Sequence, residues 1–203
     1  KEGLSLFKTI NLPDFLGGKQ WYPISDPPKF GILSLILGSV WVTVGAIAIS
    51  LPIGVASAIY ISEVAHKKAR GILKTSVELL AAIPSVVIGF IGMVTLVPFI
   101  KNFFGLSTGL TAISGSIMLA FMAIPTIVSI TEDAFYSIPK RYKEAALALG
   151  ATKWQTIWRV LLPAAFPGIV AASMLGIGRV IGETMAVMMI TGNVAKIPYS
   201  FFD

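Results

Sequence analysis

Arg179 and Glu183 are the two ionisable residues in the last apolar stretch of this sequence. Their four-residue spacing would place both side chains on one face of a continuous helix. An ionised side chain is costly inside a membrane, so such residues usually pair with one another or line a path for a polar solute. A guanidinium can also hold a carboxylate at rest and exchange it for an oxyanion. We therefore keep two interpretations open: an ion pair that fastens helices and a substrate pathway.

The composition predicts that these two residues belong to an integral membrane protein. The 203 residues are 55% hydrophobic and 13% charged, whereas soluble domains carry about 25% charged residues. The net charge of +6 could suggest nucleic acid, but lysine and arginine gather between apolar stretches, as cytoplasmic anchors do. The chain has no cysteine and one histidine, so we expect no metal site and no nucleic-acid partner.

Four apolar stretches are long enough to cross a membrane, so we expect an all-α, polytopic bundle of transmembrane helices forming one domain over residues 1–203. Proline inside a span kinks or breaks the helix, and the candidates are Pro52, Pro84 and Pro125. The expected spans are 32–61, 79–100, 109–130 and about 164–192.

Two smaller patterns refine these spans. Thr75 and Glu78 have the spacing of a capping box, which predicts that the second helix begins there. Small residues at every fourth position predict faces that allow close helix packing. They are Ala46, Ser50, Gly54 and Ala58 in the first span, and Ala164, Gly168, Ala172 and Gly176 in the last.

The basic residues also predict an orientation. They concentrate in 62–78 and 131–159, which we place in the cytoplasm. With four alternating spans, both ends of the sequence then lie outside, and 1–31 forms an extracytoplasmic or interfacial segment. A start outside without a signal peptide predicts that an earlier span is missing and that this sequence is a fragment.

A polar segment at 131–163 interrupts the apolar sequence before the last span. Lys140–Leu149 is rich in helix formers and is followed by Gly150, a residue that commonly ends a helix. Thr152 and Gln155 have capping-box spacing, which predicts a second helix after a tight turn. No P-loop, H-E-x-x-H or G-x-S-x-G pattern occurs. We therefore expect no catalytic residues, and any ATP must be hydrolysed by a partner.

This polar segment resembles the EAA loop of ABC importer permeases, whose pattern is E-A-A-x3-G-x9-I-x-L-P. Val160 replaces the usual isoleucine. In that family the loop contains the coupling helix, which docks on the ATPase subunit. The matching residues, which the resemblance assigns to ATPase coupling, are Glu144, Ala145, Ala146, Gly150, Leu162 and Pro163.

Glu78–Gly89 and Gly178–Val187 are similar to the phosphate-specific ABC importer permease, of the PstC type. The resemblance implies a six-span permease in the cytoplasmic (inner) membrane that passes inorganic phosphate inward, of which the first and last spans would be absent here. Its implied partners are ABC ATPase subunits that bind ATP and Mg, a second permease subunit (a different chain or a copy of this one), and an extracytoplasmic phosphate-binding protein. This chain itself would hold no cofactor. The resemblance also assigns Arg179 and Glu183 to the phosphate pathway.

Three alternatives remain open at this point. The chain could be an ion-coupled anion carrier or channel that uses Arg179 and Glu183 without ATP. It could be an ABC permease for another oxyanion, such as sulfate or molybdate, because the residues themselves indicate only an anion beside a buried arginine. It could also be a membrane scaffold. An EAA loop argues against the carrier, which needs no coupling element. A charge inside a broken membrane helix argues against the scaffold, which needs no such charge.

Overall fold

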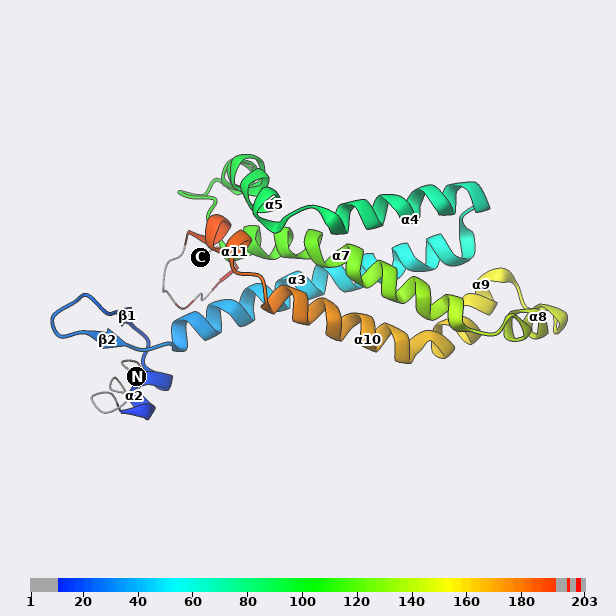
Figure 1. The fold of residues 1–203 in the computed structure, drawn as a ribbon, viewed down its shortest axis with the longest axis horizontal. Coiled ribbons are helices and arrows are strands. Elements are labelled where there is room, and N and C mark those ends of the chain that lie inside the picture. The colour runs from blue at the N-terminus through cyan, green and yellow to red at the C-terminus, as the bar shows by residue number, and fades with distance from the viewer. Residues whose placement is uncertain (1–10, 193–196, 198–199, 202–203) are drawn as a thin grey trace.

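The computed structural model describes residues 11–192, 197 and 200–201. It confirms an all-α membrane architecture, with four helices that are long and apolar enough to cross a membrane. They form an elongated bundle (Figure 1). The four helices are Leu33–Val64, Ser85–Phe104, Ala112–Ser137 and Lys153–Ile181.

The centre of the bundle consists of α3 (Leu33–Ile59), α7 (Ala112–Ser137) and α10 (Leu162–Ile181), which pack side by side (Figure 1). Ile127 of α7 is fully buried between two glycines. A Cβ atom at Gly54 of α3 would lie 2.7 Å from Ile127 Cγ2, and one at Gly176 of α10 would lie 2.9 Å from Cγ1. The two glycines therefore let three helices close around one isoleucine.

The small-residue faces behave as predicted in the first span and in part of the last. Every member of the first set, from Ala46 to Ala58, is buried. In the last span, Gly168 contacts Ala134 of α7, while Ala172 and Gly176 are buried. Ala164 is exposed. The second set therefore packs against α7 within this chain.

The second span, expected over 79–100, is broken at Pro84, one of the two outcomes that the sequence predicted for a proline inside a span. The chain forms α4 (Lys67–Ala82), then an extended Ile83–Pro84 step, then α5 (Ser85–Ile91). Helix disruption falls at Pro84 because the residue before a proline is driven out of the helical region. By contrast, α3 continues through Pro52 and α7 through Pro125.

The basic segment expected as a loop at 62–78 is largely helical, and the capping box predicted for Thr75 and Glu78 does not form. His66 is the N-cap of α4, so Thr75 and Glu78 lie inside this helix. Inside a helix the backbone N–H groups already donate to carbonyls of the preceding turn, which leaves nothing for a cap to satisfy. Packing of α4 against α7 explains why its polar first half is helical.

Three π-helical turns occur in the part of the chain that the structure describes. They are η1 (Tyr60–Val64), η2 (Gly92–Leu96) and η3 (Ile157–Leu161). The last two directly precede α6 (Val97–Phe104) and α10, each of which carries a proline in its first turn. A proline clashes with the carbonyl of the preceding turn, and the wider π turn makes room for it.

The last span differs from its predicted range of about 164–192. The helix continues through Pro163. α9 (Lys153–Thr156), η3 and α10 form one helix that ends at Ile181. A separate helix, α11 (Met185–Thr191), follows it. The third span also extends beyond its predicted end at 130, to Ser137.

The segment before the first span contains structure that the sequence did not predict. A short helix, α2 (Leu12–Gly17), precedes an antiparallel pair of strands, β1 (Trp21–Tyr22) and β2 (Lys29–Phe30). The ring of Trp21 meets the ring of Phe30 edge-on at 6.1 Å. This hairpin lies at the opposite end of the molecule from α8 (Lys140–Ala148) (Figure 1).

Candidate functional site

Arg179 connects three parts of the bundle from the last turn of α10. Its Nη1 donates to Thr126 Oγ1 of α7 at 2.7 Å, and its Nη2 donates to the Ala81 carbonyl oxygen at 3.5 Å. Ala81 lies in the last turn of α4, where carbonyls have no partner within their own helix. The guanidinium therefore donates to one of the unpaired carbonyl groups at the C-terminal end of α4, just before the break at Pro84.

Arg179 and Glu183 do not share a helix and form no ion pair with each other, so the structure does not support the interpretation that they fasten helices as a pair. α10 ends at Ile181, with Gly182 as its C-cap. Glu183 follows, and its Oε1 accepts from the Ala186 backbone N–H at 3.1 Å, in the first turn of α11. Backbone N–H groups at a helix start are unpaired and favour a carboxylate. The end of α10 thus lets Glu183 turn toward α11.

The charge of Arg179 stands without a carboxylate partner among the residues that the structure describes. Its two hydrogen-bond acceptors are a hydroxyl and a backbone carbonyl, which are neutral. The side chain is half-buried, and a guanidinium has five N–H donors. Thr126 lies near the middle of α7, so the guanidinium lies about halfway along that helix. This arrangement can attract and orient an anion.

The polar end of the molecule has the turn that the sequence predicted. α8 is followed by Gly150 in the left-handed conformation, with φ of 80°. Thr152 and Gln155 form the predicted capping box: Thr152 Oγ1 accepts from the Gln155 N–H at 3.2 Å, and Gln155 Oε1 accepts from the Thr152 N–H at 2.8 Å. The helix–turn–helix prediction for this segment is therefore confirmed.

The residues of the EAA-type pattern divide into exposed and packed ones. Glu144, Ala145 and Gly150 are exposed, whereas Ala146 is buried. Leu149 is 89% exposed, so the turn after α8 presents an apolar residue at the surface. At the start of α10, Leu162 is half-buried and Pro163 is exposed.

An ion pair connects α8 to the first span. Lys143 of α8 donates to Glu63 of η1, and the Glu63 side chain is only 12% exposed. A helix of nine residues would be marginal alone, so this link helps to fix α8 against the bundle. Trp154 and Trp158, on the following helical segment, are exposed and meet edge-on at 6.3 Å.

A buried carboxylate at Glu132 is the functional candidate that sequence reasoning missed. This α7 residue is 1% exposed and contacts two cations of α4, Arg70 Nη2 at 3.3 Å and Lys74 Nζ at 3.4 Å. Arg70 also lies over the ring of Tyr136, at 4.3 Å. Burial alone would lower the pKa of Lys74, but the carboxylates of Glu132 and Asp133 more than offset this and raise the pKa above its usual value.

A sequence signal for Glu132 did exist. It lies four residues after Val128 and three before Phe135, both of which are buried. On a helix these three positions share one face. The signal was hidden because the third span was expected to end at 130, ahead of this carboxylate.

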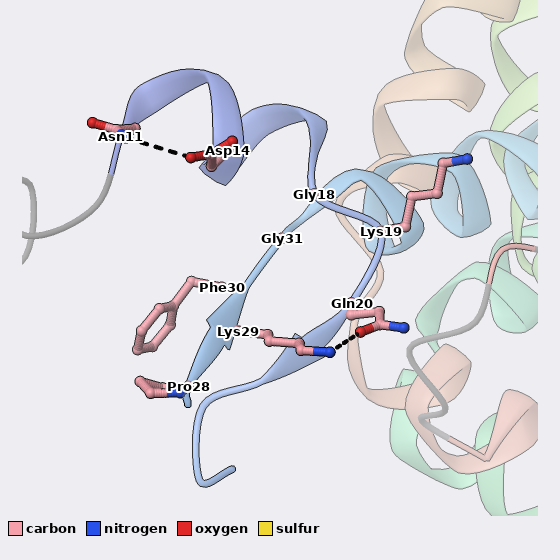
Figure 2. Close-up of a pocket in the computed structure, with 9 residues that line it drawn as sticks. All are labelled: Asn11, Asp14, Gly18, Lys19, Gln20, Pro28, Lys29, Phe30 and Gly31. Carbon is pink, nitrogen blue, oxygen red and sulfur yellow. Dashed lines mark hydrogen bonds between the residues drawn. The ribbon is translucent and has the colours of Figure 1, made fainter. Parts of the chain in front are cut away.

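A groove lies between α2 and the hairpin, at the end of the molecule opposite α8, and has a volume of about 610 Å³ (Figure 2). Lys29 Nζ donates to Gln20 Oε1 across the hairpin at 2.6 Å. The groove contains acidic as well as basic side chains, so its charge does not single out an anion. Its lining residues are Asn11, Asp14, Gly18, Lys19, Gln20, Pro28, Lys29, Phe30 and Gly31.

Four apolar helices, an unneutralised cation inside the bundle and an exposed helix–turn–helix at one end define a membrane permease. Comparison with known proteins gives the family. The family described as "Binding-protein-dependent transport system inner membrane component" matches residues 50–201, most of the chain. This chain belongs to that family of ABC importer permeases.

Several curated proteins are similar over nearly the whole chain. The "Probable ABC transporter permease protein YqgH" of Bacillus subtilis is 46% identical over 94% of this chain. The "Phosphate transport system permease protein PstC" of Mesorhizobium japonicum is 35% identical over 93% of it. The chain spans only 62% and 63% of these two relatives.

A solved structure, described as "Inward facing conformations of the MetNI methionine ABC transporter", has a similar fold. The TM-score is 0.57 and the sequence identity is 26%. The similarity covers 75% of this chain and 68% of that one. The helical arrangement is thus similar to that of a methionine ABC transporter.

Proposed function

We propose that this chain is a membrane-spanning subunit of an ABC importer that carries inorganic phosphate into the cell. The observation that carries the proposal is Arg179, a cation inside the bundle whose described partners are neutral oxygen atoms. Such a residue suits an anion rather than a neutral or cationic substrate. The relatives named as PstC phosphate permeases support phosphate as that anion.

In this proposal the phosphate path passes Arg179 and comes near Glu183, which lies two residues beyond α10. The guanidinium exchanges neutral protein acceptors for phosphate oxygens, which it can bind with two parallel hydrogen bonds. Glu183 holds the start of α11 and places a negative charge close to the path. That charge disfavours prolonged anion binding, so the phosphate can leave.

The driving force comes from separate ATPase subunits, which bind ATP and Mg and dock on α8. The exposed Glu144 and Leu149 support this contact, because a short helix with an exposed charge and an exposed apolar residue suits a partner's groove. The chain itself has no P-loop pattern and acts as a transporter subunit rather than an enzyme. A second permease subunit completes the pathway, and an extracytoplasmic binding protein delivers phosphate.

The end that carries α8 faces the cytoplasm of the cell, and the end that carries α2 and α11 faces outside (Figure 1). Basic residues support this orientation, because they favour the cytoplasmic side of a membrane. Among the residues that the structure describes, those near the α8 end are Lys67, Lys68, Arg70, Lys74, Lys140, Arg141, Lys143, Lys153 and Arg159, against Lys19, Lys29 and Lys101 near the other end.

The decisive experiment reconstitutes the complete complex in vesicles with ATP on the side of the ATPase subunits. Phosphate uptake and ATP hydrolysis are compared for Arg179→Gln and Glu144→Lys. Arg179→Gln should lose uptake while the complex still assembles, and Glu144→Lys should weaken ATPase docking or uncouple hydrolysis from transport. Normal uptake by Arg179→Gln would contradict the pathway, and uptake without ATPase subunits would contradict the ABC mechanism.

Another oxyanion is the second candidate, because a guanidinium also binds sulfate or molybdate. Uptake of labelled phosphate is therefore measured with a hundredfold excess of unlabelled phosphate, sulfate or molybdate. Phosphate alone should compete. If sulfate or molybdate competes as well as phosphate does, the substrate assignment fails while the permease assignment stands.

A further inference from the structure

The helix α4 joins the buried Glu132 cluster to Arg179. Near its start, Arg70 and Lys74 bind Glu132, and in its last turn the Ala81 carbonyl oxygen accepts from Arg179. The spacing from Arg70 to Ala81 is eleven residues, which is three helical turns and about 16 Å. All these contacts therefore fall on the face of α4 that meets α7.

The remaining faces of α4 have no comparable attachment among the residues that the structure describes. None of its residues is fully buried. On the inner face, Leu73 and Val77 pack against a cluster of Ala58, Ile61 and Val128. Lys68 and Thr75 are exposed on the outer face. Besides this apolar packing and a hydrogen bond from Arg70 Nη1 to the Ser62 carbonyl oxygen at 3.4 Å, the ionic contacts near its start fix the position of α4.

Glu132 also lies where movement of α8 would reach it. It belongs to the last turns of α7, which connects through Ile138 and Pro139 to α8 at Lys140. Glu132 is almost completely buried, and separating a buried carboxylate from its cations is very unfavourable. A displacement of this end of α7 therefore carries Arg70 and Lys74 with it, and α4 moves as a rigid helix.

We propose that Glu132 is a positioning residue for the anion pathway. Through Arg70 and Lys74 it fixes the axial position of α4. The position of α4 in turn determines where the Ala81 carbonyl oxygen lies, and this oxygen orients Arg179. A movement of α8, the helix proposed to dock on the ATPase, thereby changes the position of the Arg179 guanidinium through α4. This inference rests on the proposed function for the role of Arg179, but the placement of α4 can be tested separately.

The first test measures α4 itself. The chain has no cysteine, so Ala82→Cys gives a single site for a nitroxide spin label at the exposed end of α4. The label is introduced into this chain of the full complex, with cysteine-free partners, in lipid nanodiscs. Glu132→Gln should shorten the rotational correlation time of the label at least twofold. Lys68→Met, which removes an exposed charge from the same helix, should leave it unchanged. An unchanged spectrum in Glu132→Gln overturns the proposal.

The second test separates positioning from a general loss of structure. Glu132→Gln should lower phosphate uptake about tenfold with ATP hydrolysis kept within twofold. On an Arg179→Lys background, which retains the charge without the planar fork, Glu132→Gln should add less than twofold. Changes at distant sites without shared partners normally combine additively in free energy. Losses that multiply would therefore overturn the connection between the two residues.

A third pair of variants leaves the buried cluster untouched, in case Glu132→Gln does not fold. Thr75 and Ser76 are exposed in the middle of α4. Changing both to glycine softens the helix, whereas changing both to alanine stiffens it. The glycine pair should reproduce the loss of uptake and the alanine pair should not; equal activity of both overturns the proposal. If the unaltered complex takes up no phosphate, the proposed function fails and the spin-label result still decides the role of α4.

Discussion

Arg179 Nη1 lies 2.7 Å from Thr126 Oγ1, so a cation at the end of α10 is held by a hydroxyl from the middle of α7. The two residues are 53 positions apart in the chain. This hydroxyl orients the guanidinium without neutralising it, which leaves its charge for a substrate anion. It also makes Thr126 the most direct way to disturb Arg179 without altering its charge.

Thr126→Val should lower phosphate uptake by at least about tenfold, because a hydrogen bond to a charged group contributes roughly 1.5–3 kcal/mol. Valine keeps the shape of threonine but removes the hydroxyl. Thr126→Ser keeps the hydroxyl and is the matched control, with uptake near that of the unaltered protein. Initial uptake rates in reconstituted vesicles provide the measurement. Equal rates for the valine and serine variants would show that the contact does not orient Arg179 for transport.

Gly176→Ala should destabilise the bundle, because its Cβ atom would lie 2.9 Å from Ile127 Cγ1. Overpacking of this kind costs about 1–3 kcal/mol. Gly178→Ala on the same helix is the control, since a Cβ atom there meets nothing within 4 Å. Thermal unfolding of the purified complex should show a lower midpoint for the first variant and no loss for the second. Adding Ile127→Val, which shortens the opposing side chain, should restore part of the stability of Gly176→Ala.

Gly150→Ala should weaken docking of the ATPase subunit through backbone strain alone. The residue has φ of 80°, and a Cβ atom there would meet nothing within 4 Å. A left-handed conformation costs a residue with a side chain about 1–2 kcal/mol, and asparagine tolerates it better than alanine. Copurification of the ATPase should therefore fall in the order glycine, asparagine, alanine. Gly71→Ala, inside α4, should have no such effect, and retention of full docking by Gly150→Ala would refute the strain argument.

Lys143→Met should loosen α8, because it leaves the nearly buried Glu63 without its cation. A double-mutant cycle with Glu63→Gln should give a coupling energy of roughly 1 kcal/mol, measured from thermal unfolding. Phosphate transported per ATP hydrolysed should fall for Lys143→Met and recover partly in the exchanged pair Glu63→Lys with Lys143→Glu. Lys140→Met changes an exposed charge of the same helix and should leave the ratio unaltered. Fully additive effects of the two single changes would mean that this pair does not hold α8.

Local features of the sequence were predicted well where one turn of backbone decides them. Thr152 and Gln155 form their capping box, and Gly150 adopts the left-handed turn. The same rule failed for Thr75 and Glu78, because contacts with α7 had already made that segment helical. The helix ends were also misplaced where charged residues are buried, as at Glu132.

The amino-acid sequence by itself determined that this is an all-α membrane protein of the ABC permease family. The first conclusion follows from apolar length, and the second from the resemblance of Glu144–Pro163 to the EAA loop of that family. Only the tertiary structure decided which atoms hold Arg179, why Glu183 does not pair with it, and that Glu132 connects α7 to α4. These contacts join residues far apart in the chain, and an almost uniformly apolar sequence gives little indication of which face of a helix meets protein and which meets lipid.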